Sequence, residues 1–254
     1  MILDAFRLDG KNALVTGSRT GIGKALALAL AEAGANVVVH GSKQDGLEEV
    51  CSAARAVGVK AAAVLADLAD PQSPDRLFEG ALQEFGSLDI LINNAGILRR
   101  SPAVDYPAGA WNEILQVDLT AVFRLSQLAG KHMLSRGRGK IVNIASALSF
   151  QGGLFVPAYA AAKGGVAQLT KALANEWAAH GVNVNAIAPG YIETDVTSAL
   201  RADPVRSRQI LERIPAGRWG VPSDLAGAAV FLCSAASDYV HGALLTVDGG
   251  WLSR

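Results

Sequence analysis

Two side chains that could move a proton stand four residues apart in this chain, at Tyr159 and Lys163. Residues with this spacing share one face of a helix, so the lysine ammonium can lie close to the phenol and favour its anion. Bringing a tyrosine pKa near neutrality takes about 4 kcal/mol of preferential phenolate stabilisation. One partly desolvated cation, helped by a charged ligand, could supply this. The pair therefore predicts an acid–base catalyst.

A second candidate site is the stretch Thr16–Gly23, which holds three glycines where a predicted strand passes into a predicted helix. Glycine lets the backbone approach a ligand closely, and the amides that open a helix can point at phosphate. A tight turn with close helix packing would give the same pattern, so the turn needs support from other motifs. The candidate phosphate-binding residues are Gly17, Arg19, Thr20, Ile22 and Gly23.

The elements that position these residues follow from an alternation of short β-branched runs with longer Ala- and Leu-rich segments. Seven strands with crossover helices predict an α/β fold, a single Rossmann-type doubly wound parallel sheet with helices on both faces. Strands are expected at 12–16, 36–40, 61–66, 89–93, 140–145, 182–188 and 243–247, and helices at 21–33, 45–57, 71–85, 108–136, 157–180 and 222–234.

The whole chain, 1–254, is expected to form one domain, because no linker or repeat divides it. The alternation of Ala and Leu at 25–31 has the period of a strand, but these strong helix formers follow a glycine turn and predict a helix. The least regular stretch, 191–220, carries several arginines and two prolines. We expect it to form a lid over the site.

Composition narrows the class of ligand. The 23 lysines and arginines balance the 23 aspartates and glutamates, so no global field favours nucleic acid or anionic membranes as partners. The two cysteines show no paired spacing and the four histidines no metal-ligand spacing. With charges near the N-terminus and no long apolar run, we expect a cytoplasmic protein that binds a small molecule and no metal.

Further motifs occur in a fixed order, mostly after successive predicted strands. They are Asp67, Asn93-Asn94-Ala95-Gly96, Ser146, Tyr159-x-x-x-Lys163 and Pro189-Gly190. Together with the glycine turn, they make the chain resemble the short-chain dehydrogenase/reductase family along its whole length. The resemblance implies an NAD(P)(H) cofactor, held by the glycine turn, Asp67, Leu68, Asn94, Ala95, Gly96, Tyr159, Lys163, Pro189, Gly190, Ile192 and Thr194.

The same resemblance implies a mechanism for interconverting a secondary alcohol and a ketone. Tyr159 would be the acid–base catalyst, Ser146 would polarise the substrate oxygen, and Lys163 would bind the nicotinamide ribose and lower the tyrosine pKa. The chain departs from the family at Asp118, where an asparagine is usual. If only the backbone there matters, Asp118 is tolerated, which we expect. A carboxylate near Lys163 would instead change the pH dependence.

Cofactor choice is predicted from the end of the second strand. An acidic residue there usually grips the ribose diol of NAD(H), and this chain has Gly41, Ser42 and Lys43 instead. Arg19 adds a further cation, so NADP(H) is favoured over NAD(H). If Arg19 and Lys43 are solvated surface charges, NAD(H) remains acceptable.

The substrate is predicted from arginines at 99–100 and in the lid, since arginine suits carboxylates. Several stretches resemble family members that act on 2-keto-3-deoxygluconate or 2-deoxygluconate, which implies a sugar acid. The candidate substrate residues are Ser146, Arg100, Gln151 and Tyr191. Reductases of 3-oxoacyl carrier proteins or of gluconate-like substrates are alternatives. A cofactor-binding redox sensor is another, although such proteins usually lack the tyrosine or lysine. The resemblance also implies a homotetramer.

Overall fold

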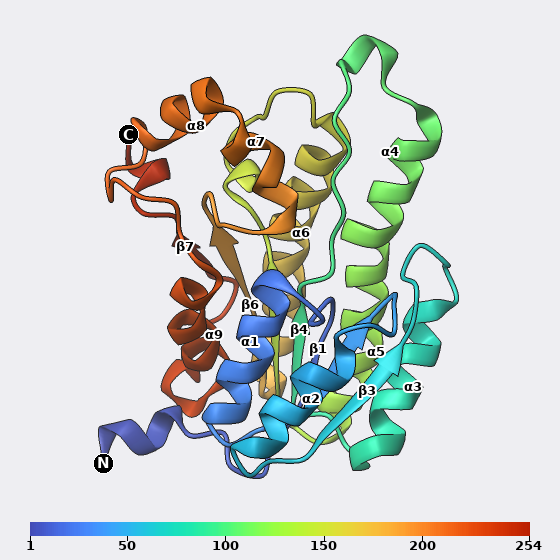
Figure 1. Cartoon of the computed structure of the whole chain (residues 1–254). Coiled ribbons are helices and arrows are strands. Elements are labelled where there is room, and N and C mark those ends of the chain that lie inside the picture. The colour runs from blue at the N-terminus through green and yellow to red at the C-terminus, as the bar shows by residue number, and fades with distance from the viewer.

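The computed structural model describes residues 1–254 and contains one sheet of seven parallel strands in the order β3-β2-β1-β4-β5-β6-β7 (Figure 1). The predicted α/β fold is therefore confirmed. The strands are β1 (Asn12–Val15), β2 (Asn36–Gly41), β3 (Ala61–Leu65), β4 (Ile90–Asn93), β5 (Gly139–Ile144), β6 (Val182–Pro189) and β7 (Leu244–Val247). Each predicted strand lies within one residue of an observed one.

Helices cover both faces of the sheet. One face packs against α1 (Gly21–Glu32), α2 (Leu47–Ala56) and α9 (Ala226–Cys233), and the other against α3 (Ser73–Phe85), α5 (Ala121–Ser135) and α6 (Pro157–Trp177). The helix predicted from the alternating Ala-Leu stretch is the interior of α1. The remaining α-helices are α4 (Ala108–Leu115), α7 (Ser198–Ala202) and α8 (Pro204–Leu211).

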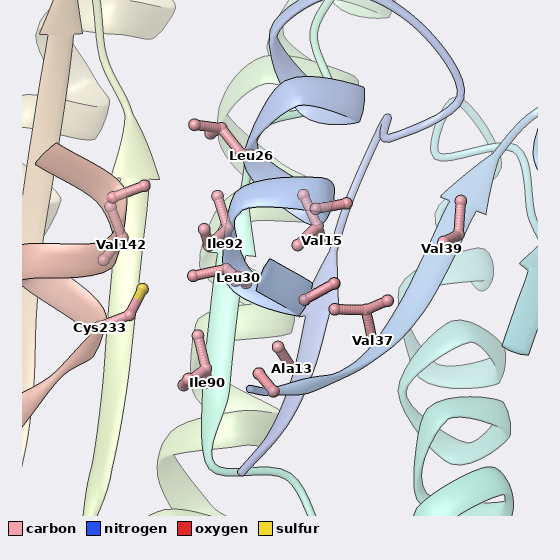
Figure 2. Packing of buried hydrophobic residues seen from close by; sticks show 14 of the residues in the cluster. Ala13, Val15, Leu26, Leu30, Val37, Val39, Ile90, Ile92, Val142 and Cys233 are labelled. Carbon is pink, nitrogen blue, oxygen red and sulfur yellow. The ribbon is translucent and has the colours of Figure 1, made fainter. Parts of the chain in front are cut away.

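The core consists of two apolar layers, one on each side of the sheet. Along β1, Ala13 and Val15 point into the α1 layer while Leu14 points into the opposite layer, as the two-residue period of a strand requires. Figure 2 shows Ala13 and Val15 among Leu26 and Leu30 of α1 and residues of neighbouring strands. Because the central strands are buried on both faces, they are rich in apolar residues, and their pattern is easy to recognise in the sequence.

The prediction of a single helix over 108–136 is wrong in one detail. It is divided into α4 and α5 by a π-helical turn, η3 (Gln116–Thr120), in which the Ala121 N–H donates to the Gln116 carbonyl. This i→i+5 bond replaces the usual i→i+4 bond and accommodates one extra residue. A single-residue bulge leaves helix propensity and amphipathic pattern almost unchanged, so the sequence did not reveal its position. The turn carries Asp118.

The segment 191–220 is more regular than predicted, since it contains α7 and α8. Its two ends are joined by backbone hydrogen bonds, from Glu193 N to the Gly220 oxygen (2.8 Å) and from Gly220 N to the Tyr191 oxygen (2.9 Å). Figure 1 shows α7 and α8 above the carboxyl ends of the central strands, with the C-terminus beside α8. No helix in the chain is both long enough and apolar enough to cross a membrane.

Candidate active site

A cleft of about 1190 Å³ opens at the carboxyl ends of the strands and contains most of the predicted site. Parallel sheets of this topology bind ligands at this edge. All but one of the predicted cofactor residues line the cleft: Gly17, Arg19, Thr20, Ile22, Gly23, Gly41, Ser42, Asp67, Leu68, Asn94, Ala95, Gly96, Tyr159, Lys163, Pro189, Gly190, Ile192 and Thr194. The exception is Lys43, which does not line it.

The glycine turn is closely packed on the loop that follows β4. Gly17 has a φ of +62°, and a Cβ atom there would lie 2.9 Å from the Ala95 Cα. A Cβ on Gly23 would lie only 2.2 Å from the Gly17 oxygen. The Asn94 side chain donates to the Thr16 and Gly17 oxygens at 2.9 and 3.1 Å. At Gly17 and Gly23 the turn therefore has no room for a side chain, and it leads into the N-terminus of α1 as a cradle that fits a dinucleotide pyrophosphate.

His40 also fixes the turn, a role that the sequence analysis missed. Its Nδ1 accepts from the Gly17 N–H (3.0 Å), and its Nε2 lies 3.0 Å from the Ala66 oxygen. Burial lowers the pKa of His40 to about 4, so the ring is neutral at physiological pH. A neutral ring with its proton on Nε2 satisfies both contacts. The parallel register of β1 and β2 places this residue beside the turn.

The charged groups near Ser42 differ from the prediction. Arg19 is paired with Asp45 (2.9 Å) and Lys24 with Glu49 (2.6 Å), and all four residues line the cleft. Both acidic residues were missed because they follow β2 by several positions instead of ending it. The Asp45 side chain is 71% exposed, so its ion pair with Arg19 contributes little to stability. Another anion can therefore replace this carboxylate as the partner of Arg19.

The predicted catalytic side chains are brought together at the inner end of the cleft. Lys163 is 3% exposed and its Nζ donates to the Ile144 oxygen at the end of β5 (3.0 Å). The same Nζ lies 5.5 Å from the centroid of the Tyr159 ring. Ser146 immediately follows this part of the sheet, where its Oγ accepts from the Leu148 N–H (3.1 Å). All three residues line the cleft.

Burial raises the pKa of Tyr159 above its ordinary value. The positive charge of Lys163 acts in the opposite direction, as expected from the sequence, and so does the Ser146 hydroxyl. The negative charge of Asp118 adds to the increase. Among the protein's own groups, desolvation therefore outweighs the lysine, and the phenol is held as a proton donor at neutral pH.

Asp118 lies directly behind this pair and is wholly buried. Its Oδ1 accepts from the Ile97 N–H (2.8 Å), and its Oδ2 lies 3.6 Å from the Lys163 Nζ without a hydrogen-bond partner. Burial raises the pKa of the Asp118 carboxyl, while Lys163 and the Ile97 N–H oppose this. Because the side chain contacts the lysine, the geometry favours the interpretation that Asp118 changes the pH dependence.

Comparisons with known proteins agree with this geometry. Residues 17–252 match the family model described as enoyl-(acyl carrier protein) reductase. The chain is 51% identical to the 2-dehydro-3-deoxy-D-gluconate 5-dehydrogenase of Escherichia coli (strain K12), with 100% of each chain covered. It is 53% identical to the enzyme of the same name from Bacillus subtilis (strain 168), with 99% of this chain and 98% of the relative covered.

This chain belongs to the short-chain dehydrogenase/reductase family. Like other members, it is an NAD(P)-dependent oxidoreductase. A similar solved structure is the gluconate 5-dehydrogenase of Burkholderia cenocepacia J2315 in complex with NADP and tartrate, with a TM-score of 0.95, 42% identity and 100% of both chains covered.

Only one of the four substrate residues predicted for this dehydrogenase lies in the cleft. Arg100, Gln151 and Tyr191 do not line the cleft, whereas Ser146 does. Tyr191 packs against Trp219 and Trp251, with ring centroids 5.5 and 4.6 Å away. Gln151 accepts a hydrogen bond from Arg213 (3.1 Å). The two tryptophans were missed because nothing in their local sequence indicates that they meet.

Proposed function

We propose that this dehydrogenase oxidises a hydroxyl group of a six-carbon sugar acid, with the C5 hydroxyl of 2-dehydro-3-deoxy-D-gluconate as the first candidate. The observation that carries the proposal is the arrangement of Ser146, Tyr159 and Lys163 in the cleft. The chain also matches relatives named 2-dehydro-3-deoxy-D-gluconate 5-dehydrogenase over its full length. The same residues would reduce the ketone in the opposite direction.

Each residue has a role that follows from its position. Ser146 donates a hydrogen bond to the substrate oxygen and so holds the reacting carbon toward the cleft. In oxidation the Tyr159 phenolate takes the hydroxyl proton, and in reduction the phenol returns it to the carbonyl oxygen. Lys163, anchored on the Ile144 carbonyl, keeps a positive charge near the tyrosine. When bound, the nicotinamide accepts or supplies the hydride at the same carbon.

We also propose that NADP(H) is the preferred cofactor. Support comes from Arg19 and Ser42, which line the cleft close to where β2 ends. The negative charge of Asp45 repels a phosphate bound beside Arg19, but the ion pair of Asp45 with Arg19 is exposed and weak. A 2′-phosphate can replace Asp45 as the partner of the guanidinium. The relative from Burkholderia cenocepacia was crystallised with NADP.

In this proposal the chain is a single catalytic domain, and residues 191–220 are its lid. Ile192, Thr194 and Arg201 of this segment line the cleft, while its ends are joined near Gly220. Such an arrangement lets α7 and α8 move as a unit over the substrate.

A homotetramer is proposed as the assembly. It is supported by Phe123 on α5, which is 43% exposed, and by β7, a partly exposed edge strand that pairs only with β6. Light scattering of the purified protein tests this, and a monomer would contradict it. The cytoplasmic location expected from the sequence stays a prediction.

The substrate proposal is tested by following cofactor absorbance with 2-keto-3-deoxygluconate, 2-deoxygluconate and gluconate, and in the reverse direction with acetoacetyl thioesters. We expect the highest kcat/KM with a sugar acid, and NADP⁺ used more efficiently than NAD⁺. Activity confined to the thioesters would show that this enzyme is an acyl reductase. Tight cofactor binding without turnover on any substrate would indicate a redox sensor.

A further inference from the structure

Seven arginines lie after β4, at 99–100, or in the lid, at 191–220, and they fall into two groups. Members of the first are paired with carboxylates: Arg99 with Glu113 (3.3 Å), Arg201 with Glu193 (3.7 Å) and Arg218 with Asp224 (2.7 Å). Members of the second have no carboxylate within 4.0 Å, and they are Arg100, Arg206, Arg208 and Arg213. Unpaired guanidinium groups of this second group are available to an anionic ligand.

Three of the unpaired arginines act electrostatically on one side chain, that of Tyr191. The charges of Arg206, Arg213 and Arg100 all lower the pKa of Tyr191, opposing the increase that burial produces. They come from separate parts of the sequence, one after β4 and two from the lid. Arg208, on the same helix as Arg206, does not contribute to this field. Arg206, Arg213 and Arg100 are therefore close enough to Tyr191 for their charges to act on it.

Arg213 is held by residues distant in the sequence, whereas the Arg206 side chain donates only to Gln209 on its own helix (2.8 Å). The Arg213 guanidinium stacks on the Trp251 ring, with 4.0 Å between the Cζ atom and the centroid. Its Nη2 donates to the Gln151 Oε1 (3.1 Å), while its Nε and Nη1 donate to no protein acceptor. Arg254 donates to the backbone oxygens of Glu212 (2.7 Å) and Arg213 (3.2 Å), which fixes the main chain as well.

Two unpartnered donors belong to the tryptophans packed around Tyr191, one of which is the ring that Arg213 stacks on. The indole N–H groups of Trp219 and Trp251 are buried without a hydrogen-bond partner. Both rings belong to an apolar cluster that includes Ala147, the residue after Ser146. Gln151, the partner of Arg213, lies five residues after that serine. The fixed guanidinium therefore lies next to the loop that follows the predicted catalytic serine.

We propose that Arg213 binds the carboxylate of the substrate, with its stacking on Trp251 and its hydrogen bond to Gln151 holding the guanidinium ready. This inference rests on the proposed sugar-acid function and adds the residue that selects an acid over an uncharged substrate. Arg206 and Arg100 supply further positive charge around the carboxylate. A guanidinium that is ordered before binding loses little side-chain entropy when the ligand arrives.

The test compares Arg213→Gln with the parent enzyme, using 2-keto-3-deoxygluconate and its uncharged amide. Glutamine keeps part of the aliphatic stem but removes the charge. We expect KM for the acid to rise on the order of 10- to 100-fold, as befits the loss of a charge-assisted hydrogen bond, with kcat little changed. KM for the amide should stay the same, so the preference for the acid should largely disappear. Arg213→Lys should recover part of it.

Arg208→Gln is the matched control, since it removes an unpaired charge nearby and should leave KM unchanged. Thermal melting and NADPH binding of both variants verify that the fold is intact. If the parent oxidises the acid and Arg213→Gln retains its KM, the inference about Arg213 is wrong while the proposed function stands. If the parent oxidises no sugar acid, the proposed function itself fails.

Discussion

The two ends of the active site are built in different ways. At the cofactor end, the glycine turn presents mainly backbone, and polar side chains such as Asn94 and the buried His40 hold it in place. At the substrate end, the surface consists of long side chains carried by loops and by the short helices α7 and α8. Their contacts are aromatic stacking and single hydrogen bonds, as at Arg213.

This difference explains why the reaction class is easier to establish than the substrate. A backbone cradle tolerates few residue types at each position, so it leaves a motif in the sequence. A set of exposed arginines can come from many positions, and only their convergence in space gives them a meaning. If the two ends are independent, a substitution at one end changes the affinity for its own ligand and leaves the affinity for the other unchanged.

The largest effect is expected where the two ends meet. Tyr159→Phe removes the hydroxyl that transfers the proton, so turnover should fall by about 10²- to 10⁴-fold. The Kd for NADPH, measured by fluorescence titration, should stay unchanged, because the ring remains in place. Turnover equal to that of the parent would exclude Tyr159 as the acid–base catalyst.

At the cofactor end, Gly23→Ala places a Cβ atom 2.2 Å from the Gly17 oxygen and 2.4 Å from the Asn94 Nδ2. Since both neighbours must move, Kd for the cofactor should rise about 10- to 100-fold. Gly227→Ala is the control, because a Cβ there meets nothing within 4 Å. It should raise the free energy of unfolding by about 0.5–1 kcal/mol and leave binding unchanged. Normal cofactor affinity in Gly23→Ala would argue against the cradle.

A smaller effect is expected from Arg19→Ala, which removes the guanidinium paired with Asp45. KM for NADPH should rise about tenfold, the loss of one charge-assisted hydrogen bond, while KM for NADH stays the same. Lys43→Ala is the control, since Lys43 does not line the cleft. Equal effects of Arg19→Ala on the two cofactors would contradict a role for Arg19 in recognising the 2′-phosphate.

The smallest change concerns the pH dependence. Asp118 raises the pKa of Tyr159, so Asp118→Asn should lower that pKa. Oxidation requires the phenolate, and its rate increases as the pH passes through the phenol pKa. The rising limb of the kcat profile should therefore move to lower pH in the variant, while the amide oxygen can still accept from the Ile97 N–H. An unchanged profile would support the tolerance of Asp118 that the sequence led us to expect.

The sequence predicted the elements and most of the residues that line the cleft, because both depend on local patterns. The strands are nearly continuous apolar runs, and Gly17, Asn94 and Lys163 belong to motifs of fixed spacing. It failed where a residue acquires its role from a distant partner. His40 required the register of β1 and β2, and Arg213 required Trp251, thirty-eight positions further along the chain. No spacing rule connects such pairs.

The π-helical turn at Gln116–Thr120 has a consequence for how α4 and α5 are oriented. Each residue of an α-helix rotates by about 100° around the axis, so one extra residue turns everything beyond it by that amount. Deleting a single residue from this turn would restore a regular helix of nearly the same length. In the shortened helix, α4 would be rotated relative to α5. If α5 kept its packing on the sheet, Asp118 could then no longer lie behind Lys163. An insertion of one residue thus acts as a rotational offset, which allows one long helix to serve both the core and the catalytic centre.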